Sequence, residues 1–385
     1  MKKPLSVFTI AATYVGTVVG AGFASGQEVL QFFGFFGGWG ILGIALSTIL
    51  FIFFGISILD LGYKLKTKSH LPVIRKTGGR WISRLMDIVI TFFLFGALVT
   101  MAAGAGAIFA EQLKLPALWG SLLMVTITLL TVLLGLNRVI ESISFVAPIL
   151  LVSVLTISLW TIFSNPQALI TNLSWSQTAR AAVPYWPVSA VLYVSYNLVL
   201  AMAVLAPLGA LSNPTNSRSG AIFGGLGLGV GVLAITAAIL TKVPQVTNLE
   251  VPMIAIAGGI SPFFRSAYSI ILFAEVYTTA VASLYGFASR LTEPESSAYK
   301  WLSTVVSVVA FAGAQFGFSK IVGTLYPAVG FAGLLLLGTL AYGYLKALVT
   351  TGFGGIRPEP ALKPIQEEKL SKTKTKNSSS DVEND

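Results

Sequence analysis

The chain has no cysteine and a single histidine, His70, among its 385 residues. Disulfides, thiol nucleophiles and structural zinc sites need cysteine or several histidines. The sequence therefore excludes disulfide frameworks, cysteine-based catalysis and multi-histidine metal centres. It also contains no recognisable set of nucleophile and base residues, so we expect no catalytic residue, no resident metal and no cofactor, and we do not expect an enzyme.

Charged residues are also scarce. They make up 10% of the chain, whereas hydrophobic residues make up 55%, and the mean hydropathy is +0.81. Soluble domains carry roughly 25% charged residues, so this composition is that of an integral membrane protein. The net charge of +10 does not require a nucleic-acid partner, because the cytoplasmic loops of membrane proteins carry excess Lys and Arg.

Long apolar stretches fill most of the chain. A membrane-spanning helix needs about 20 largely apolar residues, and ten stretches come close to this requirement. They cover 5–36, 38–62, 85–111, 117–136, 139–163, 187–211, 219–241, 264–289, 300–317 and 321–348. The sequence predicts an all-α membrane domain over 1–350. The Pro-, Lys-, Glu- and Ser-rich tail over 351–385 cannot bury enough apolar area to order itself, so we expect it to be disordered.

Basic residues predict the orientation of these spans. An even number of spans puts both termini on one side, and a cytoplasmic N-terminus places 20 of the 25 Lys and Arg residues inside. The five outside are Lys114, Arg180, Lys242, Arg265 and Lys320. This asymmetry predicts a protein of the cell membrane with both termini in the cytoplasm. Segment 64–84, with seven basic residues and no acid, is expected to be the main cytoplasmic loop and to contact anionic lipid headgroups.

The first span is weakened in its middle. It carries four glycines, Gly16, Gly20, Gly22 and Gly26, where a plain anchor would carry leucines. In hydrocarbon, an unwound backbone is tolerated only where it is buried in protein or lines a water-filled cavity. We therefore predict that the helix opens over 20–24 and that the freed backbone groups face a binding site at membrane depth.

Two polar residues follow the predicted opening. Ser25 and Glu28 have the spacing of a capping box, in which the serine caps a helix and the glutamate returns to the serine amide. This pattern predicts that the outer half of the helix begins at Ser25. Glu28 then has two interpretations, as part of that cap or as a residue that binds solute or carries a proton, since carboxylates within membranes are usually functional.

The ten spans divide into two sets of five, and an odd number of helices gives the two sets opposite orientations. This arrangement permits an inverted repeat. The first helix of the second set, 187–211, contains Pro207. Because proline lacks an N–H group and clashes with the preceding turn, it predicts a break in the sixth helix as well.

The segment Gly-Ala-Gly-Phe-Ala-Ser-Gly-Gln-Glu at 20–28, its position in the first span and the layout of ten spans resemble the YkvI-like bacterial membrane proteins. These form a branch of the amino acid-polyamine-organocation (APC) superfamily. The resemblance covers residues 5–350. It implies a LeuT-type fold of two inverted five-helix repeats, with helices one and six broken. It also implies secondary active transport, commonly of amino acids or related solutes, driven by Na⁺ or H⁺.

The eighth span suggests a site for the coupling ion. Glu275 lies near its middle with no basic residue within several turns, so it either carries a proton, binds a cation or forms a neutral hydrogen bond to nearby backbone. Thr278 and Thr279 resemble the hydroxyl pair that binds Na⁺ in LeuT-like sodium-coupled families. The resemblance places the remaining ligands at carbonyl groups near Gly16 and Val19. The alternative is that both threonines bond to their own preceding turn or to a neighbouring helix.

The predicted solute site combines the first and sixth helices. It comprises Gly20, Gly22, Ala24, Ser25, Gly26 and Glu28 of the first helix and Tyr193, Tyr196 and Asn197 of the sixth. An ionised Glu28 would compete with a solute carboxylate, so an amine-bearing or zwitterionic solute is favoured over an anion. The sequence thus predicts a transporter of an amino acid or related amine, coupled to Na⁺ or H⁺, that works by alternating access. The alternative is a non-transporting receptor or assembly protein with the same fold.

Overall fold

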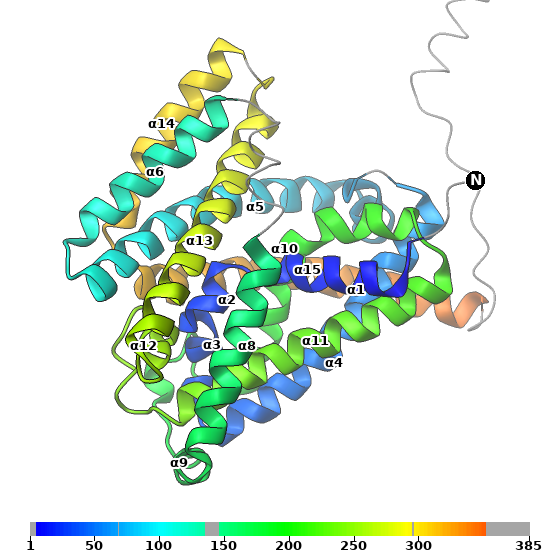
Figure 1. Cartoon of the computed structure of the whole chain (residues 1–385). Coiled ribbons are helices and arrows are strands. Elements are labelled where there is room, and N and C mark those ends of the chain that lie inside the picture. The colour runs from blue at the N-terminus through cyan, green and yellow to red at the C-terminus, as the bar shows by residue number, and fades with distance from the viewer. Residues whose placement is uncertain (1–4, 68, 135–145, 295, 352–385) are drawn as a thin grey trace, which may run out of the picture.

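The computed structural model describes residues 5–67, 69–134, 146–294 and 296–351, which contain helices and no strand (Figure 1). The predicted all-α fold is confirmed. Two predicted segments fall partly outside the described residues: the tail from residue 352 and the start of the fifth span.

Each predicted span coincides with one long helix or, in the first case, with a series of short ones. The first span contains α1 (Val7–Val18), α2 (Ala21–Ser25), α3 (Gln27–Phe32) and η1 (Gly34–Phe36). The others are α4 (Gly38–Leu65), α5 (Leu71–Ile108) continued by η2 (Phe109–Leu113), α6 (Ala117–Leu133), α8 (Val146–Ser164), α10 (Trp186–Ala210), α11 (Pro214–Leu240), α13 (Pro262–Leu291), α14 (Ser297–Ala314) and α15 (Phe318–Thr351). The connections contain the short helices α9 (Pro166–Asn172), η3 (Thr178–Arg180) and α12 (Pro252–Gly258).

Six of these helices are long and apolar enough to cross a membrane individually: α4, α5 with η2, α10, α11, α13 and α15. Residues 148–164 and 166–172 form an additional apolar pair bent by 87°, and α1 and α6 are shorter apolar helices. The chain is a multi-pass membrane protein; the count of ten crossings stays a prediction.

The helices form two packed groups. In one group, α4 packs against α10 and α11, and α1 packs against α11. In the other, α5 packs against α6, α13 and α14, while α15 contacts both α5 and α10. Figure 1 shows α6, α13 and α14 together on one side of the molecule and α1, α4 and α11 on the other.

Glycines set the close approach of helices in the first group. Tyr14 of α1 is fully buried between Gly55 of α4 and Gly224 of α11, where a Cβ atom on either glycine would lie 2.7 or 2.6 Å from the tyrosine ring. The Tyr14 hydroxyl donates to the carbonyl oxygen of Phe51 at 2.8 Å. These contacts fix α1 against its neighbours up to the residue where it ends.

Segment 64–84 is not the loop that was predicted. Helix α5 already begins at Leu71, with Pro72 in its first turn, where proline is tolerated. Val73 and Ile74 are fully buried, and their apolar side chains hold this part of the helix against the core. Gly79 (φ 78°) is the one residue of α5 with non-helical angles, and it kinks the helix there. The basic residues of this segment therefore lie largely on a helix.

The predicted break in the sixth helix is wrong. α10 runs from Trp186 to Ala210 with Pro207 in its last turn. This end of the helix is held by backbone contact with α4: Gly62 packs on the carbonyl group of Ala206, and Gly209 packs on that of Leu59. Membrane helices tolerate proline where neighbouring helices support the freed groups, so Pro207 does not open the helix.

Candidate functional site

The predicted break in the first helix is confirmed, but its predicted extent over 20–24 is wrong, because residues 21–25 form the short helix α2. α1 ends at Val18, and Val19 (φ −73°, ψ 111°) and Gly20 (φ −132°, ψ −171°) are extended before α2 begins at Ala21. A second interruption follows at Gly26, whose φ of 80° lies in the left-handed region that favours glycine. The last carbonyl groups of α1 and the first N–H groups of α2 therefore lack helical partners.

The predicted capping box is wrong. Ser25 is the last residue of α2; its hydroxyl donates to the carbonyl oxygen of Gly22 at 2.8 Å and accepts the amide of Gln27 at 3.2 Å. Because Gly26 turns the chain, it occupies the capping position of α3 in place of Ser25. The carboxylate of Glu28 lies instead against Gly22, where an added Cβ atom would collide with Oε2.

A cavity of about 360 Å³ lies where the first helix opens. It brings together ten of the predicted site residues: Gly16, Val19, Gly20, Gly22, Glu28, Tyr196, Asn197, Glu275, Thr278 and Thr279. A Cβ atom on Gly16 or Gly20 would meet no atom within 4 Å, so both glycines border open space. Residues from α1, α2, α3, α10 and α13 thus share one chamber.

Four predicted site residues do not line this cavity. The Ala24 carbonyl oxygen accepts a hydrogen bond of 2.5 Å from the hydroxyl of Tyr268 on α13, which anchors α2. Ser25 bonds within α2, as described above, and Gly26 packs on Met253. The ring of Tyr193 lies behind that of Tyr196, with 5.6 Å between the ring centroids. These residues support the cavity wall.

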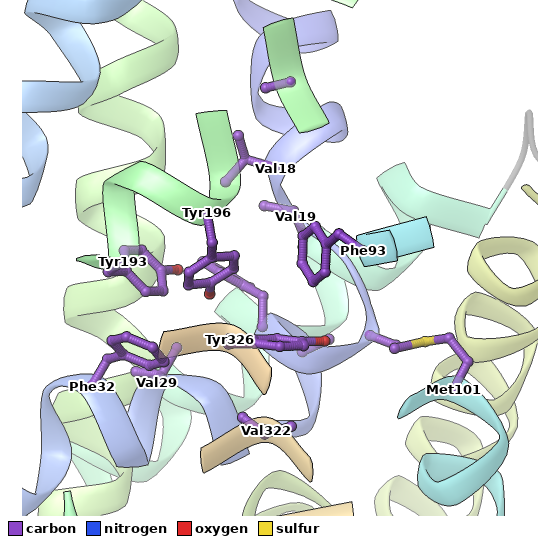
Figure 2. Packing of buried hydrophobic residues seen from close by; sticks show 14 of the residues in the cluster. Val18, Val19, Val29, Phe32, Phe93, Met101, Tyr193, Tyr196, Val322 and Tyr326 are labelled. Carbon is purple, nitrogen blue, oxygen red and sulfur yellow. The ribbon is translucent and has the colours of Figure 1, made fainter. Parts of the chain in front are cut away.

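The cavity wall also contains Phe93, Met101 and Tyr326, which were not among the predicted site residues. Tyr326 of α15 lies 4.9 Å from Tyr196 and 5.6 Å from Phe93, measured between ring centroids. Figure 2 shows these three rings gathered beside Val19. An aromatic residue in an apolar span usually belongs to the core, so only the tertiary structure identifies these as cavity residues.

Several buried polar atoms around the cavity lack hydrogen-bond partners among the described residues. They are Glu28 Oε1, Glu275 Oε2 and the hydroxyl oxygens of Tyr193 and Tyr196. Both tyrosines and Asn197 adjoin the Glu28 carboxylate, but none forms a hydrogen bond of ordinary geometry with it. Buried polar groups are normally satisfied, so this cluster is typical of a site that receives a ligand.

One of the two threonine hydroxyl groups near Glu275 bonds within its own helix, as the alternative to a Na⁺ site predicted. Thr278 Oγ1 donates to the carbonyl oxygen of Glu275 at 3.0 Å, within its own preceding turn. Its oxygen keeps lone pairs that can accept or coordinate. Thr278, Thr279 and Glu275 all line the cavity together with the end of α1.

The electrostatic character of the cavity is one-sided. Glu28 and Glu275, each 5% exposed, are the two acidic residues among the described residues that line it, and these lining residues include no Lys, Arg or His. No group of three Asp, Glu, His or Cys side chains suited to a metal ion occurs in the described part of the chain. The site therefore combines two carboxylates with hydroxyl, amide and aromatic groups.

Comparisons with known proteins agree with this description. Models of known protein families give no match. The chain is 30% identical over 342 residues to the uncharacterized membrane protein YkvI of Bacillus subtilis (strain 168), which covers 87% of this chain and 95% of that protein. It is 28% identical over 324 residues to YyaD of the same organism, covering 84% and 92%.

Solved structures with the same fold include transporters. The structure of MhsT in complex with L-phenylalanine aligns with a TM-score of 0.60 at 16% identity, covering 92% of this chain and 90% of that one. A Na⁺-coupled sialic acid symporter aligns with a TM-score of 0.59 at 14% identity, covering 88% and 79%. At such low identity the likeness establishes the LeuT-type fold alone.

Proposed function

The chain belongs to the family of bacterial membrane proteins represented by YkvI, and we propose that it is a secondary transporter coupled to Na⁺ or H⁺. It moves a small polar solute, an amino acid or a related amine, across the cell membrane by alternating access. Both termini lie in the cytoplasm. The observation that carries the proposal is the opening of the first helix at Val19 and Gly20 onto a cavity that also receives Glu275 and Tyr196.

The coupling ion binds between α1 and α13. Gly16 and Val19, at the end of α1, line the same cavity as Glu275, Thr278 and Thr279, which supports a role for the last carbonyl groups of α1 as ligands. Oxygen ligands suit a hard cation such as Na⁺, and the buried carboxylate of Glu275 is suited to carry a proton. The solved neighbour that is a Na⁺-coupled symporter supports ion coupling on this fold.

The solute binds at the opposite wall, formed by α2, α3 and α10. Glu28 provides a charged anchor, Tyr196 and Asn197 provide polar groups, and the backbone at Gly20 and Gly22 gives close approach. Because both ligands meet at one interrupted helix, movement of α1 relative to α13 alters both sites at once. This linkage is the physical basis for coupled transport.

Reconstitution into liposomes tests the proposal. Purified full-length protein is placed in liposomes with an imposed Na⁺ gradient, a pH gradient or neither, and the uptake of labelled amino acids and amines is measured. Accumulation that requires one gradient supports a coupled transporter. Binding of a solute without flux under any gradient would contradict transport and favour a receptor.

A further inference from the structure

We propose that the solute is an organic cation, an amine that carries no carboxylate group. This inference rests on the proposed function and narrows its substrate class. It excludes ordinary zwitterionic amino acids, although the LeuT-type neighbour MhsT was solved with one. Three features of the cavity support it: its charge, the position of Glu28 and its aromatic wall.

The charge of the cavity favours a cation. Glu28 and Glu275 line it, and none of the described lining residues is basic. A zwitterion would bring its own carboxylate into a chamber that already has two carboxyl groups, and beyond the proposed coupling ion the described lining residues provide no guanidinium, ammonium or imidazolium group to balance it. Burying an unpaired charge is costly, whereas an ammonium group would satisfy the unpaired Glu28 Oε1.

Glu28 also lies against the opened backbone of the first helix, at the first turn of α2. The Glu28 carboxylate lies directly against Gly22 in this first turn, close enough that an added Cβ atom would collide with it. The protein thus supplies its own carboxylate at this position, and the complementary solute group is an amine.

The aromatic wall suits an organic cation. The rings of Phe93, Tyr196 and Tyr326 lie with their centroids 4.9 to 6.1 Å apart and all border the cavity. Ring faces attract ammonium groups, most strongly where water is excluded. They also give apolar surface to the carbon skeleton of the solute. A bare metal ion would gain little from this surface, so the wall favours an organic amine over an inorganic cation.

A matched set of compounds tests the inference on the unmodified protein. Each set contains an amine, an amino acid and a carboxylic acid that share one side chain. The first set is phenethylamine, L-phenylalanine and 3-phenylpropionate, and the second is isobutylamine, L-valine and 3-methylbutanoate. Affinities are measured at pH 7 by titration calorimetry and by thermal shift of full-length protein in lipid nanodiscs, with Na⁺ and with choline. MnCl₂ is a further probe.

We expect at least one amine to bind ten-fold or more tightly than its amino acid, and the acids not to bind. The inference is overturned if an amino acid or acid binds as well as its amine, if only Mn²⁺ binds, or if none of the amines binds. The experiments distinguish failure of this substrate assignment from failure of the proposed transport function. An amine that binds but shows no gradient-driven flux refutes transport alone, and a transported amino acid refutes the amine assignment alone.

Two variants locate the interaction. Glu28→Gln should weaken amine binding ten-fold or more and leave binding of the neutral alcohol analogue unchanged. Glu111→Gln is the matched control, because the Glu111 carboxylate accepts hydrogen bonds from the amides of Glu250 and Val251 away from the cavity.

Should Glu28→Gln fail to fold, Phe93→Leu replaces it. We expect this variant to lose several-fold in affinity for the amine and less in affinity for the alcohol. Unchanged amine affinity in the folded variant contradicts the inference.

Discussion

The side-chain amide of Gln27 donates to the hydroxyl of Ser319 at 2.6 Å and so joins α3 to the beginning of α15. Gln31, one turn further along α3, donates to the carbonyl oxygen of the same serine at 2.8 Å. α3 carries Glu28, and α15 carries Tyr326, so the contact holds two walls of the cavity together. Alternating access, as proposed above, requires such walls to separate during the transport cycle.

Crosslinking this contact should stop transport. The chain has no cysteine, so a variant with Gln27→Cys and Ser319→Cys has only these two thiols. A short bifunctional thiol reagent should abolish flux in proteoliposomes, and a reducing agent that cleaves the crosslink should restore it. The two single-cysteine variants, treated in the same way, are the controls. Full flux in the crosslinked protein would show that α3 and α15 need not separate.

Glu275→Gln should uncouple transport from the ion gradient. The carboxylate is 5% exposed and lies in the cavity with Thr278 and Thr279. Its amide keeps the shape but can neither carry a proton nor balance a cation. We expect exchange of labelled solute across the membrane to continue while accumulation driven by a gradient falls at least ten-fold. Accumulation at the unmodified level would contradict the assignment of Glu275.

The sequence predicted those features that follow from local chemistry. Four glycines in one span predicted an opening because glycine weakens a helix, and the opening lies at Val19 and Gly20, whose extended backbone angles do not themselves require glycine. The left-handed turn at Gly26, which moved the start of α3 past Ser25, depends on one backbone angle that the sequence pattern does not specify. The effect of Pro207 also depended on packing, since α10 stays continuous where Gly62 and Leu59 of α4 support it.

Asp60→Asn should lower the free energy of unfolding by about 2 kcal/mol, because it removes the charge from a buried carboxyl group that accepts hydrogen bonds from a charged partner. Asp60 is 1% exposed; its Oδ2 accepts from Arg218 at 3.1 Å and from the Tyr344 hydroxyl at 3.1 Å. The measurement is thermal or denaturant unfolding in detergent. Asp87→Asn is the matched control: Asp87 is 48% exposed and pairs with Arg290 at 2.6 Å, so its loss should cost less than about 1 kcal/mol. Equal effects would contradict the importance of burial.

Gly22→Ala should weaken solute binding ten-fold or more. The new methyl group would collide with the Glu28 carboxylate and approach the Tyr326 hydroxyl at 3.4 Å, so the carboxylate must move from its present position. Gly338→Ala in α15 is the control, because a Cβ atom there meets nothing within 4 Å and alanine favours the helix. Calorimetry with the bound solute compares the two variants. Unchanged affinity for Gly22→Ala would separate Glu28 from the solute site.

His70 should titrate below its ordinary pKa of 6.5. Burial is the largest cause that lowers the pKa of this imidazole, and the positive charge of Arg290 lowers the pKa further. The negative charge of Asp87 raises the pKa and so opposes both effects. A lowered pKa in the folded protein means that folding favours neutral His70. Its contribution to stability is therefore complete above pH 6.5 and is lost as the pH falls through the lower folded value.

The pH dependence can be measured on one signal, because His70 is the single histidine of the chain. Histidine-selective NMR labelling should give a midpoint below 6.5, and Arg290→Gln should raise it because a repelling positive charge is removed. Arg84→Gln is the control, since the Arg84 guanidinium lies over the ring of Trp81. His70→Gln should flatten the fall in unfolding temperature at acid pH. A midpoint at or above 6.5 in the unmodified protein would mean that water reaches the ring or that Asp87 outweighs Arg290.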